Sequence, residues 1–339
     1  TVVLLVLGLI LVFAGTLAQV ELGIWTVQEK FFRSFVAIWK VGALYVQLPG
    51  GYAVGGLLLI NLLAAHLYRF KRGWKKVGIE MTHIGLILLL VGELLSGLWQ
   101  EDFSMRLVQG ESKNYSESYR DNELAIVDTT DAKTEDVVVI PEPLLAKGET
   151  VQHPKLPFRV VTKKHYPNSR LRMRGPMVDN ATTIGDTALV TTGAGTQLVA
   201  SPAPISYKQD ERNWPTAFVE LVGAQGSLGT WLVSQAPLDA EGHQLSPQRF
   251  EHAGRTYTIA LRSTRSYKPF ALTLLKFSHD RYAGTEIPKN FSSRIRLNTP
   301  DGRDDREVLI YMNNPLRYAG LTFYQASFEP GNDKVTVLQ

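Results

Sequence analysis

The sequence of 339 residues contains no cysteine. Without a thiol, the chain can form no disulfide, no CxxC redox pair, no thiolate nucleophile and no CxxCH motif for covalent haem attachment. If thiol or thioether chemistry is involved, the sulfur therefore belongs to a partner.

Several catalytic signatures are also absent. The sequence has no GxSxG nucleophile elbow, no HExxH zinc motif and no GxxxxGK[ST] phosphate loop. The histidines after residue 100 lie in polar loops or at strand ends without the spacing of metal ligands, and we expect surface or hydrogen-bonding roles for them: His153, His165, His243, His252 and His279. This pattern argues against a phosphate- or zinc-dependent enzyme.

Charge is scarce in the first 99 residues and balanced in the rest. Residues 1–99 hold 8 Lys+Arg and 4 Asp+Glu, whereas residues 100–339 hold 28 of each. The net charge of +4 therefore arises in the N-terminal part, and nothing in this balance calls for a nucleic-acid partner.

Three apolar runs are present, at about residues 1–18, 52–68 and 77–98, and we expect each to form a transmembrane helix. The first run begins without Met, so we expect the natural chain to begin before Thr1. The segment 19–50 is amphipathic and aromatic, which predicts either a helix in the headgroup layer on the outer side or a connecting loop.

The loop 69–76 between the second and third runs, RFKRGWKK, is strongly basic. The positive-inside rule predicts that it is cytoplasmic. Everything from residue 100 onward then lies on the periplasmic, extracytoplasmic side of a bacterial inner (plasma) membrane. The basic loop is also a candidate contact for anionic lipid.

Residues 100–339 contain short runs rich in β-branched and aromatic residues, separated by Gly, Pro, Asn and Asp clusters. This pattern predicts a large all-β domain, either a sandwich or a pair of packed sheets. A stretch with four prolines marks either a boundary between two β subdomains or a long surface loop: Pro141, Pro143, Pro154 and Pro157.

His83 lies within the third apolar run. An ionisable side chain is costly in hydrocarbon, so such a residue suggests a metal or haem ligand or a proton relay. The alternative is a histidine that hydrogen-bonds to a neighbouring helix.

Three segments resemble ResB, also called CcsB, of the System II cytochrome c biogenesis machinery. They are MRLVQGES after the third run, LTLLKFSHDRYAGTEIPKNFSSRIRL at 272–297 and YMNNPLRYAGLTFYQASFEP at 311–330. The helix order, the basic inner loop, the position of His83 and the cysteine-free β domain agree with the resemblance. Residues from about 132 to 255 resemble the family only in general character and not in specific motifs.

The resemblance implies a subunit of a cytochrome c synthetase, or haem lyase, with a non-catalytic or co-catalytic role. Together with a CcsA-like membrane protein it would carry haem b outward for thioether attachment to apocytochrome c. A thioredoxin-like thiol reductant is a further expected partner. A fourth helix after the β domain, beyond Gln339, is also implied. The alternative is a ResB-like structural subunit that holds a membrane cytochrome or respiratory complex together without haem turnover.

The resemblance also implies that His83 is an axial ligand of the haem iron. His66 lies near the inner end of the second apolar run, within a few residues of the same depth as His83, and is a second candidate ligand. Interfacial hydrogen bonding, or reaching the cytoplasmic surface, is the alternative role for His66. Thr82 and Glu80 are candidates to orient the His83 ring.

Overall fold

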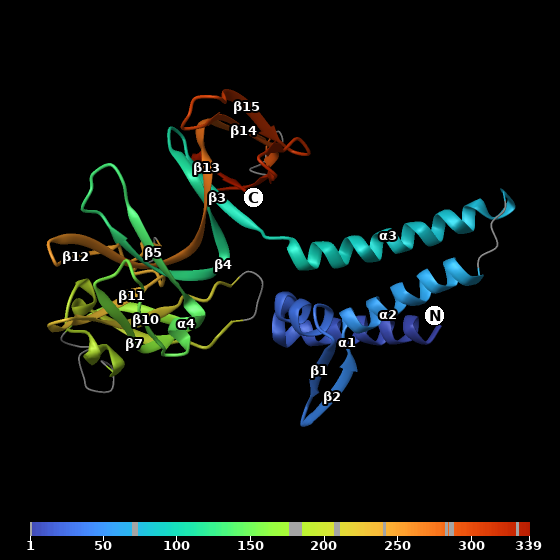
Figure 1. The fold of residues 1–339 in the computed structure, drawn as a ribbon, viewed down its shortest axis with the longest axis horizontal. Coiled ribbons are helices and arrows are strands. Elements are labelled where there is room, and N and C mark those ends of the chain that lie inside the picture. Colours follow the sequence, from blue (N-terminus) through green and yellow to red (C-terminus); the bar gives the residue numbers. More distant parts are fainter. Residues whose placement is uncertain are drawn as a thin grey trace. The chain divides into compact units, whose positions relative to one another are not determined.

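The computed structural model describes residues 2–69, 74–175, 185–206, 211–239, 242–281, 284, 288–329 and 332–339. The chain divides into two compact units, whose elements are labelled in Figure 1. The helical unit comprises Thr1–Glu101 and Pro204–Asn213, and the β unit comprises Asp102–Ala203 and Trp214–Gln339.

The helical unit contains three helices that are long and apolar enough to cross a membrane. They cover Val2–Phe32, Gly51–Tyr68 and Val77–Trp99. Their α-helical parts are α1 (Val2–Val27), α2 (Gly51–Ala64) and α3 (Val77–Trp99). A π-helical turn, η1 (Gln28–Phe32), extends α1, and a second, η2 (Ala65–Arg69), extends α2. These helices confirm the three apolar helices expected from the sequence.

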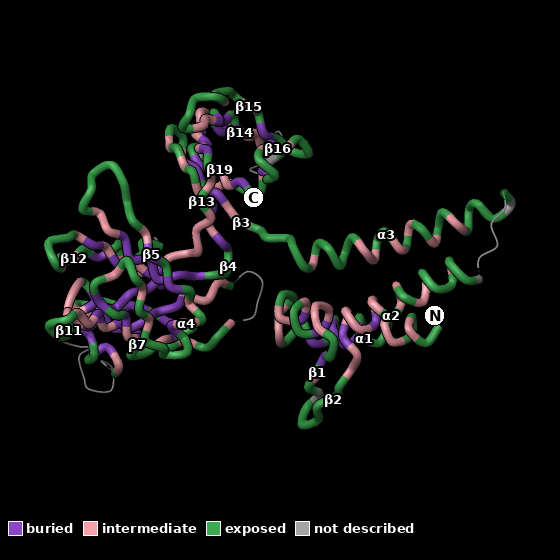
Figure 2. The backbone as a smooth tube through the Cα atoms, viewed as in Figure 1, coloured by how far each residue is buried: buried purple, intermediate pink, exposed green. Residues whose placement is uncertain are grey.

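Many apolar side chains of these helices are exposed. In Figure 2 the tube of α3 is green and pink, the colours of exposed and intermediate residues. Helix α3 has no buried residue, and Phe13 of α1 is 65% exposed. In water such a surface would be unfavourable, at about 25 cal/mol for each Å² of apolar area. A surface of this kind is typical of helices surrounded by lipid or by partner helices.

The segment after α1 differs from the expected interfacial helix or loop. Helix α1 is kinked at Gly23, whose φ of 71° is not helical, and the helical segment after the kink runs to Phe32. The chain then forms a hairpin of β1 (Val36–Val41) and β2 (Leu44–Pro49). The sequence VAIWKVGALYV explains the difference, because its β-branched and aromatic residues favour strands. Gly42, at φ 61°, supplies the left-handed turn residue between them.

The hairpin packs on α1 in a small core. Side chains of α1, η1 and β1 form this cluster: Leu11, Ala14, Ala18, Val27, Phe31 and Ala37. Trp39 and Leu48 of the hairpin pack against its edge. The aromatic residues that suggested a helix in the headgroup layer are thus partly used to attach the hairpin to α1.

The β unit confirms the mostly β architecture. A four-stranded sheet has the order β11-β10-β7-β6, and the main path of the larger sheet is β15-β14-β13-β4-β3-β19-β18. Strand β12 pairs with β13, β5 pairs with β4, and β8-β9 and β16-β17 are separate two-stranded sheets. Antiparallel pairing explains the many short turns in this part of the sequence.

The elements of the first half of the β unit are β3 (Phe103–Val108), β4 (Ser112–Asp128), β5 (Asp136–Pro141), α4 (Glu142–Ala146), β6 (Thr150–Val151), β7 (Phe158–Tyr166), β8 (Ser169–Met173) and β9 (Leu198–Pro202). Those of the second half are β10 (Thr216–Gly223), β11 (Gly226–Ser234), β12 (Gln248–His252), β13 (Arg255–Arg281), β14 (Pro288–Asn298), β15 (Asp305–Tyr311), β16 (Leu316–Tyr318), β17 (Leu321–Phe323), β18 (Gln325–Glu329) and β19 (Asn332–Leu338).

The long strands β4 and β13 pair with each other, and β13 contributes to two hydrophobic cores. Leu124 and Ile259 belong to a core shared with the four-stranded sheet, whereas Leu272 belongs to a core with Leu107 and Ile310. Figure 2 shows this buried interior of the β unit in purple.

The proline-containing stretch is not a boundary between cores. Ile140 and Leu145 lie before or within it, Phe158 follows it, and all three belong to the same core. The change from one core to the next occurs along β13. Pro143 lies in α4, and Pro154 and Pro157 lie between β6 and β7.

Candidate functional site

Two histidines meet between the second and third helices. His66 comes from η2 at the end of α2, and His83 comes from α3. Their ring centroids are 6.4 Å apart and the ring planes are inclined by 81°. The two residues that the sequence analysis placed at similar depth thus face each other within one unit.

The acidic residue Glu80 lies beside this histidine pair. Its Oε1 lies 3.8 Å from Nε2 of His66, and both side chains are largely shielded, at 23% and 14% exposure. Glu80 precedes His83 by three residues on α3, a spacing that places both side chains on adjoining parts of one helix face. At this distance the carboxylate forms an ion pair with His66 when the imidazole is protonated.

Thr82, considered above as a residue that orients the His83 ring, hydrogen-bonds within its own helix. Its Oγ1 donates a hydrogen bond to the carbonyl oxygen of Gly78, at 2.9 Å, one turn earlier in the same helix. Such a bond satisfies the hydroxyl within the helix. Glu80 is therefore the better placed of the two to orient an imidazole, although the one it approaches is that of His66.

Two imidazoles and one carboxylate can support two kinds of chemistry. Neutral imidazole nitrogens are good axial ligands for haem iron. Alternatively, a His–Glu pair can pass a proton. Among the described residues, no group of three or more His, Cys, Asp or Glu side chains is arranged to hold a metal ion, so the pair does not resemble a closed zinc site.

The basic loop adjoins this pair in sequence, but residues 70–73 lie outside the described part of the chain. The expectation that Lys71 and Arg72 mark the cytoplasmic side therefore stays a prediction. Beyond the gap, a 3-10 turn (Trp74–Lys76) leads into α3. Trp74 is 94% exposed there.

The histidines of the β unit make local contacts. Nε2 of His165 lies 3.0 Å from Oε1 of Glu142, and Nδ1 of His243 lies 2.7 Å from Oδ2 of Asp239. His252 and His279 have aromatic neighbours, namely Phe158 for the first and Phe277, Phe291 and Phe328 for the second. The contacts of His165 and His243 fit the hydrogen-bonding role expected from the sequence, whereas the aromatic neighbours of His252 and His279 were not expected.

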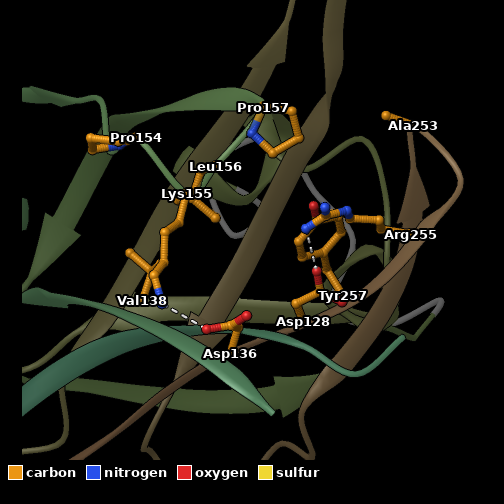
Figure 3. A pocket seen from close by; sticks show the side chains of 10 residues that line it. All are labelled: Asp128, Asp136, Val138, Pro154, Lys155, Leu156, Pro157, Ala253, Arg255 and Tyr257. Atoms are coloured by element: carbon orange, nitrogen blue, oxygen red, sulfur yellow. Dashed lines mark hydrogen bonds and ion pairs between the residues drawn. The ribbon is translucent and has the colours of Figure 1, made fainter. Parts of the chain in front are cut away.

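A pocket of about 380 Å³ opens in the β unit (Figure 3). Two ion pairs lie in its wall, Lys155 with Asp136 at 2.6 Å and Arg255 with Asp128 at 3.1 Å. Burial raises the pKa of the Tyr257 hydroxyl, so this phenol is neutral at physiological pH. The two acidic and two basic side chains of these ion pairs balance in charge. No histidine is among the described residues that line the pocket, so the pocket offers no imidazole to haem iron.

Comparison with known proteins points to one family. Residues 240–339 match the family model described as "ResB-like family". This match contains two of the three segments that carried the resemblance, 272–297 and 311–330, and it confirms the resemblance to ResB.

Protein NrfI of Wolinella succinogenes is 37% identical to this chain over 70 residues. The aligned region is 21% of this chain and 8% of NrfI. The similarity thus spans a small part of that relative's length.

Proposed function

We propose that this chain, whose residues 240–339 match the ResB-like family model, takes part in cytochrome c biogenesis as a subunit of a System II cytochrome c synthetase. With a CcsA-like membrane partner, it carries haem b outward and presents it for thioether attachment to apocytochrome c. The observation that supports this most directly is the His66–His83 pair, which adds a candidate haem site to the family match.

His83 is the proposed axial ligand of the haem iron. It lies on an apolar helix able to cross a membrane, and its ring faces a second imidazole in the same unit. With ring centroids 6.4 Å apart, the two imidazoles are close enough that both would be able to hold one haem iron.

His66 is the proposed second ligand when the subunit holds haem without its partner. The Glu80 carboxylate, 3.8 Å from Nε2 of His66, is near enough to influence the position of the ring. With iron bound, two imidazoles supply a six-coordinate, low-spin site. A histidine of the CcsA-like protein could replace His66 when the two proteins assemble.

The chain itself supplies no sulfur to the reaction, because it has no cysteine. The two thiols come from the apocytochrome, and a thioredoxin-like reductant keeps them reduced. The role of this subunit is thus to bind and orient the haem, in a non-catalytic or co-catalytic part of the haem lyase.

Absorption spectra of the detergent-purified chain, with and without its partner, test the proposal. We expect a six-coordinate haem b spectrum for the wild type. His83→Ala should lose at least about tenfold in bound haem or give a five-coordinate spectrum, because one iron ligand is missing. His66→Ala should give a five-coordinate spectrum in the isolated subunit only.

The matched control is His243→Ala, because His243 lies in the β unit and its side chain is 68% exposed. This variant should retain the wild-type spectrum. Equal spectra for wild type and His83→Ala, or no haem even with the partner present, would reject His83 as a ligand. That result would favour a ResB-like structural subunit.

A further inference from the structure

A hollow of about 800 Å³ lies between α1 and the hairpin of the helical unit. Leu17, Leu22, Ile38 and Trp39 give it apolar walls, and charged residues of α1, η1 and β1 line it as well. Its size lies within the range of about 300–1,000 Å³ typical of small-molecule sites. All of its lining belongs to residues 17–45, so one compact unit forms it.

The charges in this hollow are of both signs. Glu29 pairs with Arg33 at 3.1 Å, and the Lys40 ammonium lies 5.9 Å from the ring centroid of Tyr45. Among the described residues, Glu21 and Lys30 form no ion pair. The hollow therefore offers an available carboxylate and an available ammonium that do not neutralise each other.

The hollow lies where the apolar part of α1 ends. Residues 1–20 carry no charge, and Glu21 is the first charged residue of the chain. Two aromatic residues with polar tips, Trp39 and Tyr45, line the hollow. Such residues gather at the boundary between the hydrocarbon and headgroup layers of a membrane.

We propose that this hollow binds the headgroup of a zwitterionic phospholipid such as phosphatidylethanolamine. Lys30 and Lys40 face the phosphate, and Glu21 faces the ammonium. The acyl chains follow the exposed apolar surface of α1, where Leu17 is 46% exposed and Phe13 65%. The inference rests on the proposed membrane function, because that function places α1 in a bilayer.

Charge complementarity distinguishes this ligand from two others. The carboxylates of haem could pair with the lysines, but haem has no ammonium group to offer Glu21. An anionic lipid such as phosphatidylglycerol has the phosphate but no ammonium, and it too would leave Glu21 without a cationic partner. A zwitterion satisfies both signs, and its ammonium can donate hydrogen bonds to a carboxylate.

The test is lipid exchange followed by native mass spectrometry on the full chain. The purified protein is equilibrated with an equimolar mixture of phosphatidylethanolamine, phosphatidylcholine and phosphatidylglycerol, and the retained lipids are counted. We expect the wild type to retain phosphatidylethanolamine preferentially. Equal retention of the three lipids, or a preference for phosphatidylglycerol, would overturn the proposal.

Variants locate the site. Lys30→Gln combined with Lys40→Gln should reduce retained phosphatidylethanolamine about threefold to tenfold, since each exposed charge pair contributes modestly. Lys76→Gln removes the same charge outside the hollow and should behave as wild type. Unchanged retention in the double variant, or an equal loss in the Lys76→Gln control, would reject the site.

Glu21→Gln provides a readout that misfolding cannot imitate. Without the carboxylate, the preference should shift from phosphatidylethanolamine toward phosphatidylglycerol, whereas an unfolded protein would lose all lipids alike. A preference that does not shift would contradict the assigned orientation. Haem spectra of the same samples separate the two proposals. An intact haem spectrum without a lipid preference rejects only the lipid site. A lipid preference without bound haem rejects only the haem function.

Discussion

Asp128, at the end of β4, accepts hydrogen bonds from its neighbour. The backbone N–H of Thr130 donates to Oδ1 of Asp128 at 3.0 Å, and the Thr130 hydroxyl donates to the same oxygen. These bonds, chiefly that from the hydroxyl, lower the pKa of Asp128, and Arg255 adds to the effect. A carboxylate held in this way stabilises the folded state only while it is ionised.

We expect Asp128→Asn to reduce the free energy of unfolding by about 1 kcal/mol at pH 7, because charge-assisted hydrogen bonds and an ion pair are weakened. The folded-state pKa lies below the unfolded value of about 3.8. The wild-type advantage is thus fully present above that value and is lost as the pH falls through the lower, folded-state pKa. Urea unfolding followed by tryptophan fluorescence at pH 7 and near pH 3 measures it.

The control for this prediction is Asp131→Asn, in the loop that follows β4. Asp131 also has a lowered pKa, caused mainly by the backbone N–H of Lys133, but no ion pair joins it to another described residue. Its substitution should have a smaller effect at pH 7. A wild-type advantage over Asp128→Asn that persists undiminished near pH 3 would show that ionisation of Asp128 is not its source.

At the scale of elements, the connection from the hairpin to α2 is tightly packed. A Cβ at Gly51, the first residue of α2, would lie 2.2 Å from the carbonyl oxygen of Phe32. Backbone hydrogen bonds hold the same place, from Gly50 N–H to Phe35 and from Tyr52 N–H to Ser34. The start of α2 is therefore fixed against η1 by contacts that leave no room for a side chain.

We expect Gly51→Ala to destabilise the helical unit by about 2–3 kcal/mol, because the backbone must shift to relieve the contact. Thermal unfolding of the detergent-solubilised chain measures the loss. Gly55→Ala is the matched control, since a Cβ there would meet nothing within 4 Å in the same helix. Alanine also has the higher helix propensity, so this control should be neutral or stabilising. A Gly51→Ala protein as stable as the control would contradict the packing described here.

The helices and most of the β unit were predictable from the sequence. Long apolar runs predicted the three helices, because a membrane-length run has few alternative structures. Short runs rich in β-branched and aromatic residues predicted the strands of the β unit. The hairpin at 36–49 was missed because its aromatic residues also fit the spacing of an amphipathic helix, and strand pairing depends on contacts that a local pattern does not contain.

The candidate site was predictable in part. His83 could be identified because an ionisable residue in an apolar run is unusual. The approach of His66 followed from the short connection between α2 and α3, but the distance between the rings depends on side-chain directions that sequence does not give. The hollow beside α1 was not predictable, because it exists only once the hairpin packs on the helix.

At the scale of the whole molecule, the proposed function requires a defined orientation in the membrane. If all three helices cross the membrane, the two ends of the helical unit lie on opposite sides, and the basic loop predicts which side is cytoplasmic. Haem can be presented to an exported apocytochrome only if the β unit lies outside. The orientation is therefore a condition of the function, and it can be measured without haem.

The absence of cysteine makes single-cysteine labelling free of background. We expect Ala132→Cys, in the exposed loop between β4 and β5, to react with a membrane-impermeant maleimide in intact spheroplasts. Lys76→Cys, before α3, should react only after the membrane is permeabilised, because the bilayer keeps the charged reagent from the cytoplasmic side. The unmodified chain should show no labelling in either condition. The reverse pattern would place the β unit in the cytoplasm, where it could not present haem to an exported cytochrome, and it would reject the proposed direction of transport even if His83 binds iron.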